Sequence, residues 1–299
     1  MEQQAFFHIC ANGDDAKDFI LSEQDFFAAF NRVGVCAANS DTEVVVFSIE
    51  ETHPHFLLFG TRSGCISFTR LYKISTLRYI ARTRGNTDGV SLHFEMYSVE
   101  DKDYLMNVGT YIVSQPTKDG KTVLPFDYPW GSAPLYFRAG DTVPVWYTYK
   151  RAVPKTVRVC DLTRRKRDSI LHSKMKVPGE WQVCNDFLLP ENYVNTKLFE
   201  SIYSTHNCYR TFLSSGRNRD AVVISKMASV RGVLLDDFEA RRVCRELAKE
   251  KFGTCDVRRM PVPDRLSLAG MLRRQYRISF RQLSALTRIH EAEIRKYIR

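Results

Sequence analysis

The stretch Val44-Val45-Val46-Phe47-Ser48-Ile49, followed closely by Phe56-Leu57-Leu58-Phe59, decides the fold. Both runs are rich in β-branched or large apolar residues, which is typical of strands with little exposure to water. Only a short polar link separates them. The stretch therefore predicts two neighbouring strands of a sheet.

Predicted helices and strands also precede and follow these two strands in the sequence. In residues 23–37, for example, Phe26, Phe30 and Val33 recur at helical spacing. The predicted order of strand, helix, two strands, helix, strand and helix fits an α+β fold with an antiparallel sheet. We expect the helices on one face, the split βαβ arrangement of ferredoxin-like and RRM-like domains. The further elements are a strand over 3–10, a helix over 66–83, a strand over 92–97 and a helix over 103–114 that ends before Pro116.

The charge of the 299-residue chain changes along its length. Residues 1–136 carry 11 Lys+Arg against 17 Asp+Glu, residues 137–264 carry 24 against 15, and residues 265–299 carry 9 against 2. Basic segments of this kind can hold a polyanion, most simply nucleic acid, although a solvated basic surface is the alternative. We predict three parts, 1–136, a basic connecting region over 137–260, and a basic module over 261–299.

The composition also excludes several classes of protein. Apolar residues make up 44% and charged residues 26%, as in ordinary globular chains. No apolar run reaches the ~18 residues of a membrane span, and the N-terminus lacks the pattern of a signal peptide. The 8 cysteines are scattered without a C-x-x-C pair. They indicate reduced thiols of a cytoplasmic protein rather than disulfides or a zinc site.

The last 35 residues show the pattern of three short helices. Leu266, Leu272 and Tyr276 line the first, and Ser279 with Gln282 forms a capping box that starts the second. Short helices joined by tight turns are typical of a helix-turn-helix DNA-binding module. A small helical bundle used for packing or dimerisation is the alternative.

Two pairs of side chains in residues 1–136 are candidates for metal binding or catalysis. His53 and His55 flank Pro54 at the start of a strand, so both imidazoles should project to one side and could meet on a cation. Tyr111 and Gln115 are four residues apart and share a helix face. Structural histidines, a core tyrosine and a polar residue of the last turn are the alternatives.

Four motifs together resemble the single-tyrosine HUH transposases, in particular the REP-associated tyrosine transposases. That family has the patterns N-H-x-H-L-L, Y-I-x-x-N-P-V-x-x-G and D-Y-x-W-S-S. The resemblance covers about residues 3–136. The motifs are Phe7-His8-Ile9, Thr52-His53-Pro54-His55-Phe56-Leu57-Leu58, Tyr111-Ile112-Val113-Ser114-Gln115-Pro116 with Gly120, and Asp127-Tyr128-Pro129-Trp130-Gly131-Ser132.

The resemblance implies specific roles for these residues. His53, His55 and Gln115 would bind a divalent metal ion, Mg²⁺ or Mn²⁺, and Tyr111 would be the nucleophile that forms a 5′-phosphotyrosine link with DNA. The chain departs from the pattern at Thr52 and at Gln115, where the family usually has Asn. The insertion-sequence branch of these transposases uses Gln at the second position. The implied partner is single-stranded or hairpin DNA, bound by a monomer or a homodimer.

Basic residues outside the site are candidates for contacts with DNA phosphates. One group lies in the helix that follows the histidine motif, and the other lies in the C-terminal helices. A solvated basic face is the alternative for both. Tyr128 and Trp130 could stack on unpaired bases or pack in the core. The two basic groups are Arg62, Arg70, Lys73, Arg78 and Arg82, and Arg281, Arg288, Arg295 and Lys296.

The sequence thus predicts a metal-dependent single-strand DNA endonuclease and strand-transferase of transposase type. The alternative is a DNA-binding regulator on the same fold whose nicking activity is lost. The combination of His53, His55, Tyr111 and Gln115 favours the enzyme, because a binding protein has no use for all four. An RNA-binding protein on an RRM-like sheet is disfavoured because no aromatic RNP-type run is present.

Overall fold

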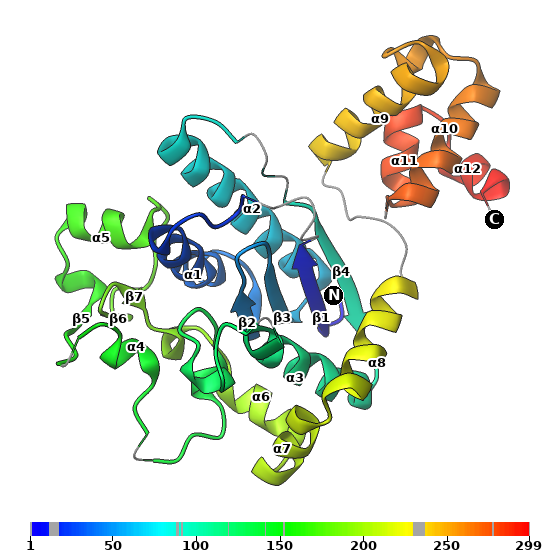
Figure 1. Cartoon of the computed structure of the whole chain (residues 1–299). Helices are drawn as coiled ribbons and strands as arrows, with labels where there is room; N and C mark the ends of the chain where they lie inside the picture. The colour runs from blue at the N-terminus through cyan, green and yellow to red at the C-terminus, as the bar shows by residue number, and fades with distance from the viewer. Residues whose placement is uncertain are drawn as a thin grey trace. The chain divides into compact units, whose positions relative to one another are not determined.

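Figure 1 shows a computed structural model of the chain, which describes residues 2–11, 18–87, 90, 92–118, 120–140, 142–151, 153–229, 237–276 and 278–298. Internal contacts divide the chain into two compact units. The first comprises Met1–Leu92 and Met96–Ser225, and the second comprises His93–Glu95 and Lys226–Arg299. The expected boundaries after residues 136 and 260 do not coincide with this division, and the three functional parts stay a prediction.

A four-stranded sheet lies at the centre of the first unit, except for Phe94 and Glu95 at the start of its last strand, which belong to the second unit (Figure 1). The inner strands β1 and β3 are antiparallel, with Cys10 opposite His55 and His8 opposite Leu57, and β2 pairs antiparallel with β3. An inner pair of β1 and β3 is the split βαβ arrangement that the sequence predicts. The strands are β1 (Ala5–Ala11), β2 (Thr42–Ile49), β3 (Pro54–Gly60) and β4 (Phe94–Val99), in the order β2-β3-β1-β4.

Helices cover both faces of the sheet. On one face Phe56 of β3 packs against Tyr72 of α2, with ring centroids 5.1 Å apart. On the other face the neighbouring His55 packs against Tyr111 of α3 at 5.7 Å. Adjacent residues of a strand point to opposite faces, so the expectation of helices on one face only is wrong. The helices are α1 (Glu23–Ala37) and α2 (Arg62–Arg84) on the first face and α3 (Lys102–Lys118) on the second.

The limits of these helices follow from local chemistry. The predicted helix over residues 23–37 is confirmed, and Ser22 caps it by accepting the backbone N–H of Asp25 at 3.2 Å. α2 ends at Gly85, whose φ of 82° is in the left-handed region that glycine adopts most easily. The expectation that the next helix stops before Pro116 is wrong, because α3 continues to Lys118. Pro116 lies in the last turn, where its missing N–H removes only one helical hydrogen bond.

The segment around residues 128–132, which follows α3, covers the outer edge of β2. The backbone N–H of Ile49 donates to the carbonyl of Trp130, and that of Ser132 donates to Phe47. The Trp130 ring stacks on Phe26 at 4.9 Å, and the Tyr128 hydroxyl donates to the Ile49 carbonyl at 2.6 Å. Trp130 and Tyr128 therefore pack in the core, as one of the two interpretations predicted, and this segment protects a sheet edge.

The rest of the first unit contains a small second sheet and several helices. The sheet has the order β5-β6-β7. The elements are η2 (Pro125–Asp127), η3 (Ala133–Leu135), α4 (Val145–Thr148), β5 (Thr156–Arg158), η4 (Val159–Asp161), α5 (Arg164–Leu171), β6 (Gln182–Cys184), β7 (Phe187–Leu188), η5 (Pro190–Asn192), α6 (Thr196–Tyr203), α7 (His206–Ser214) and α8 (Gly216–Ser229), of which α8 belongs to the first unit as far as Ser225.

The second unit contains the three short helices that the sequence predicts. Ser279 and Gln282 form the predicted capping box at the start of α11. Arg288 occupies the position after α11 with φ of 57°, a left-handed conformation that favours glycine. Leu268, Leu283 and Ile294 are fully buried and form one core with α9. The elements are α9 (Asp237–Phe252), η6 (Val257–Arg259), α10 (Val262–Gln275), α11 (Phe280–Thr287) and α12 (Glu291–Tyr297).

Two expectations about the class of protein concern cysteines and membrane spans. None of the eight cysteines forms a disulfide, as the sequence predicts. Among the helices that the structure describes, none has both the length and the apolar character needed to cross a membrane.

Asn31 of α1 forms hydrogen bonds with residues far along the chain. Its amide nitrogen donates to the carbonyls of Ile170 and Asp186, at 3.0 and 2.8 Å, and its oxygen accepts the N–H of Leu188 at 2.8 Å. The side chain is fully buried. One residue of α1 thus satisfies three backbone groups of the segment that follows residue 136.

Replacing Asn31 should therefore destabilise the whole first unit. We expect Asn31→Ala to lower the free energy of unfolding by about 2–4 kcal/mol, because buried backbone groups lose their partners. Tryptophan fluorescence during urea denaturation would measure this, since all 3 tryptophans lie in the first unit. Asn39→Ala, which removes an exposed amide from the same region, is the control and should cost about 1 kcal/mol or less. Equal losses in the two variants would contradict the role given to Asn31.

Candidate functional site

A cluster of polar side chains lies on the sheet face beneath α3. His8 and Cys10 are two residues apart on β1 and therefore point to the same face. Cys10 stands directly opposite His55 of β3. The rings of His8 and His55 are stacked with centroids 5.9 Å apart. The potential ligand atoms of these three residues all lie within 4.8 Å of one another.

Both histidines of this cluster are buried and uncharged. Their exposed fractions are 0% for His8 and 2% for His55. Burial lowers the pKa of His8 to about 3, and burial together with His53 holds the pKa of His55 well below its ordinary value. Among the residues that the structure describes, neither ring has a hydrogen-bond partner at either nitrogen. Neutral imidazoles with available lone pairs are the form that binds metal ions.

Tyr111 projects from α3 onto this cluster. Its ring lies 5.7 Å from His55 and 6.1 Å from His8, edge-on to both. The residue is largely buried, with an exposed fraction of 9%. Burial, with a smaller contribution from Cys10, raises the pKa of Tyr111 to about 12. The phenol therefore carries its proton at neutral pH.

Two other residues of α3 contact the tyrosine. Gln115 follows by one helical turn, and its amide nitrogen donates to the Tyr111 carbonyl at 3.1 Å. The ammonium group of Lys118 lies 4.0 Å from the centre of the Tyr111 ring and forms an ion pair of 2.9 Å with Asp220. These contacts place an amide and a cation next to the phenol.

His53 lies just before β3, at the end of the turn that joins it to β2. Its ring centroid is 4.6 Å from that of His55, and its Nδ1 atom is 2.8 Å from the Thr52 hydroxyl. The backbone N–H of Glu50 donates to the His53 carbonyl at 3.0 Å, and Ser48 donates to the buried Glu50 carboxylate. This turn fixes His53 beside His55.

The structure brings the rings of three of the four predicted site residues into contact, one after the other. His53 contacts His55, and His55 contacts Tyr111. Gln115 lies on the same helix as Tyr111, and its hydrogen bond runs to that residue rather than to a histidine. The roles of these residues as ligands and nucleophile stay predictions.

Sequence reasoning missed the contribution of β1. His8 belongs to a motif that the resemblance quotes, but no site role follows from that motif, and the cysteines were not expected to form a metal site. The period-two alternation of a strand places His8 and Cys10 on one face. That signal is present in the sequence, but the pairing of β1 with β3 is needed to bring His55 beside them.

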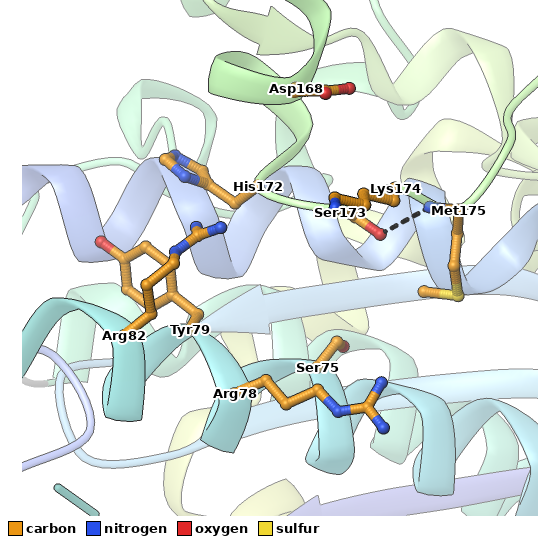
Figure 2. Close-up of a pocket in the computed structure, with 9 residues that line it drawn as sticks. All are labelled: Ser75, Arg78, Tyr79, Arg82, Asp168, His172, Ser173, Lys174 and Met175. Carbon is orange, nitrogen blue, oxygen red and sulfur yellow. Dashed lines mark hydrogen bonds between the residues drawn. The ribbon is translucent and has the colours of Figure 1, made fainter. Parts of the chain in front are cut away.

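The basic residues of α2 lie along the opposite side of the sheet from the tyrosine helix. Arg78 and Arg82 line a pocket of about 550 Å³ between α2 and the end of α5. Figure 2 shows Arg82 extending toward His172, and Arg78 extending along α2. Lys174 also lines this pocket, with Asp168 as its one acidic residue. Of the other predicted contacts, Arg62 and Arg70 are exposed and Lys73 is half-buried.

The predicted basic residues of the second unit are all exposed. They are Arg281, Arg288, Arg295 and Lys296. Arg295 pairs with Glu291 one turn earlier in α12 and lies over the Phe280 ring at 4.2 Å. Its charge is therefore partly compensated within the unit.

Comparisons with known proteins give one structural likeness. A solved structure described as a REP-associated tyrosine transposase bound to a REP hairpin is similar, with a TM-score of 0.32 and 16% sequence identity. The likeness covers 42% of this chain and 75% of that chain. No family model matches the chain, and no curated protein matches its sequence.

Proposed function

We propose that the chain is a metal-dependent single-strand DNA endonuclease and strand-transferase, with Tyr111 as its nucleophile. The observation that carries this proposal is the edge-on contact of Tyr111 with His55, whose two ring nitrogens have no partner among the described residues. A phenol beside neutral imidazoles suits a covalent attack on a phosphate that a cation holds.

His53, His55 and Gln115 are the proposed ligands of a divalent cation, Mg²⁺ or Mn²⁺. The adjacent rings of His53 and His55 offer nitrogen donors, and the Gln115 amide offers an oxygen one turn after Tyr111. All three donors are neutral, and mixed nitrogen and oxygen donors suit Mn²⁺ at least as well as Mg²⁺. The bound cation would act as a Lewis acid on the scissile phosphate.

Tyr111 would start the reaction by attacking the phosphorus of a DNA phosphodiester. A bond forms between the phenol oxygen and phosphorus, and the bond from phosphorus to the 3′ oxygen breaks. The phenol proton is released and the 3′ oxygen takes up a proton, which leaves a 5′-phosphotyrosine link and a free 3′-hydroxyl. The covalent link conserves bond energy for joining to a second strand.

Two basic regions would bind the DNA backbone. In the first unit the pocket lined by Arg78, Arg82 and Lys174 has the size and charge to hold phosphate groups. In the second unit, residues 261–299 would act as a DNA-reading module, with Arg281 and Arg288 exposed at either end of α11. The expected partner is single-stranded or hairpin DNA.

The first prediction for this function concerns Tyr111. Tyr111→Phe should lower cleavage and formation of the covalent adduct on the order of a thousandfold or more, because the attacking oxygen is lost. DNA binding and thermal stability should stay near wild type. Denaturing electrophoresis of labelled hairpin oligonucleotides with Mn²⁺ would measure the adduct. Tyr104→Phe, a buried tyrosine two turns earlier in α3, is the control. An adduct of wild-type yield from Tyr111→Phe would refute the assignment.

A second prediction tests Gln115 as a ligand. Gln115→Asn keeps the carbonyl but shortens the side chain by about 1.5 Å, so it should retain measurable cleavage. Gln115→Ala should lose most cleavage at low Mn²⁺ and recover part of it as Mn²⁺ rises, because a missing ligand mainly lowers metal occupancy. Ser114→Ala, next to it in α3, should behave as wild type. An alanine variant that cleaves at the wild-type rate under limiting Mn²⁺ would exclude Gln115 from the metal site.

A third prediction uses the conformation of Arg288. Because its φ is 57°, Arg288→Gly should keep or improve folding while it removes one cation. If this arginine contacts a DNA phosphate, the slope of log affinity against log salt should fall by about 0.7–0.9. Arg259→Gln, which removes a cation that pairs with Asp256 elsewhere in the unit, should leave the slope unchanged. Equal slopes for Arg288→Gly and wild type would remove Arg288 from the DNA-binding surface.

A further inference from the structure

The side chains of His8, Cys10 and His55 form a compact group with the chemistry of a metal site. Cys10 and His55 are directly opposite in the pairing of β1 with β3, and His8 is the next residue on the same face of β1. Their potential ligand atoms lie within 4.8 Å of one another, and all three residues are buried. Within the part of the chain that the structure describes, no other group of histidine, cysteine and acidic residues meets this condition.

The environment of the two rings favours a ligand between them. Four ring nitrogens, two on His8 and two on His55, are buried without a hydrogen-bond partner among the described residues. Buried polar atoms of folded proteins are normally paired, and an unpaired one carries a desolvation penalty. A cation bound by one nitrogen of each ring would satisfy two of these four atoms.

The donor types select the kind of cation. Two imidazole nitrogens and a thiolate favour Zn²⁺ and similar transition metals, whereas Mg²⁺ and Ca²⁺ prefer oxygen donors. Ligand atoms around a tetrahedral zinc ion lie about 3.3–3.6 Å apart, given zinc–nitrogen and zinc–sulfur bonds of about 2.0 and 2.3 Å. Atoms that already lie within 4.8 Å need to move by about an ångström to reach this geometry.

We propose that His8, Cys10 and His55 form an inner site for a thiophilic transition-metal ion of the Zn²⁺ type. The inner site differs from the ligands proposed for DNA cleavage, which are His53, His55 and Gln115. His55 belongs to both groups. A cation in the inner site therefore withdraws His55 from the other group, and the two sites exclude each other.

The consequence for activity rests on the function proposed above. Zn²⁺ should inhibit DNA cleavage that Mn²⁺ supports, because it occupies His55 from the side of β1. Cys10 supplies the thiolate that distinguishes the inner site, so Cys10→Ser should cleave DNA with Mn²⁺ and should lose most of the inhibition by Zn²⁺.

Cobalt spectroscopy of the full-length, metal-free chain tests the site independently of activity. Titration with Co²⁺ should give the intense visible bands of a tetrahedral ion together with a thiolate-to-cobalt charge-transfer band, and Zn²⁺ should bleach both. Cys10→Ser should lose the charge-transfer band, and His8→Ala should bind Co²⁺ at least tenfold more weakly. Cys36→Ser, which removes another buried thiol, and His53→Ala should keep the band. A charge-transfer band of equal strength in Cys10→Ser would overturn the inner site.

A second measurement uses only the wild-type chain, so it tests the inner site even if the variants fail to fold. X-ray absorption of the wild-type chain with one equivalent of Zn²⁺ should show one sulfur and two imidazole ligands, and a spectrum without a sulfur shell would overturn the proposal. Failure of cleavage under all conditions, with the cobalt and zinc spectra as expected, would refute the proposed function and leave the inner site supported. Equal zinc inhibition of wild type and Cys10→Ser would refute the exclusion between the two sites.

Discussion

The antiparallel register of β1 against β3 is the constraint on which the candidate site depends. It places Cys10 opposite His55, and it turns both toward α3. The aromatic packing on the other face holds this register, because Phe56 lies between Phe68 and Tyr72 of α2 at ring distances of 5.3 and 5.1 Å. A slip by one residue would exchange the two faces, burying histidines among aromatic rings and exposing Phe56 to α3. The apolar core on one face thus fixes the polar chemistry on the other.

The position of Tyr111 depends on parts of the chain well beyond residues 3–136. The Tyr203 hydroxyl of α6 donates to the Met106 carbonyl of α3 at 2.7 Å. At Gly109 a Cβ atom would lie 2.4 Å from that hydroxyl oxygen, so only glycine lets the two helices approach this closely. Tyr111 follows Gly109 by two residues. The segment after residue 136 therefore holds the tyrosine helix against the sheet, which explains why it belongs to the same compact unit.

The sequence predicts those features that depend on local patterns. Helical spacing of Phe26, Phe30 and Val33 gives the limits of α1, and the capping box at Ser279 gives the start of α11. Features that depend on tertiary packing were missed or wrong. Periodicity does not say which sheet face a helix covers, so the opposite placement of α3 had no local signal. Likewise, the metal-ligand pattern of Cys10 and His55 exists only across two strands, and no spacing along the chain reveals it.

The two proposed ligand groups differ in charge, which would give them different chemistry even though they share His55. The donors of His53, His55 and Gln115 are all neutral, so a cation held by them keeps its full charge for the oxygens of a phosphate. A Cys10 thiolate neutralises one unit of that charge and binds only after it has lost its proton. Cys10 is also more deeply buried than Tyr111, with exposed fractions of 3% and 9%. The inner site is therefore suited to retaining a cation. The proposed ligands His53, His55 and Gln115 are suited to presenting a cation to DNA.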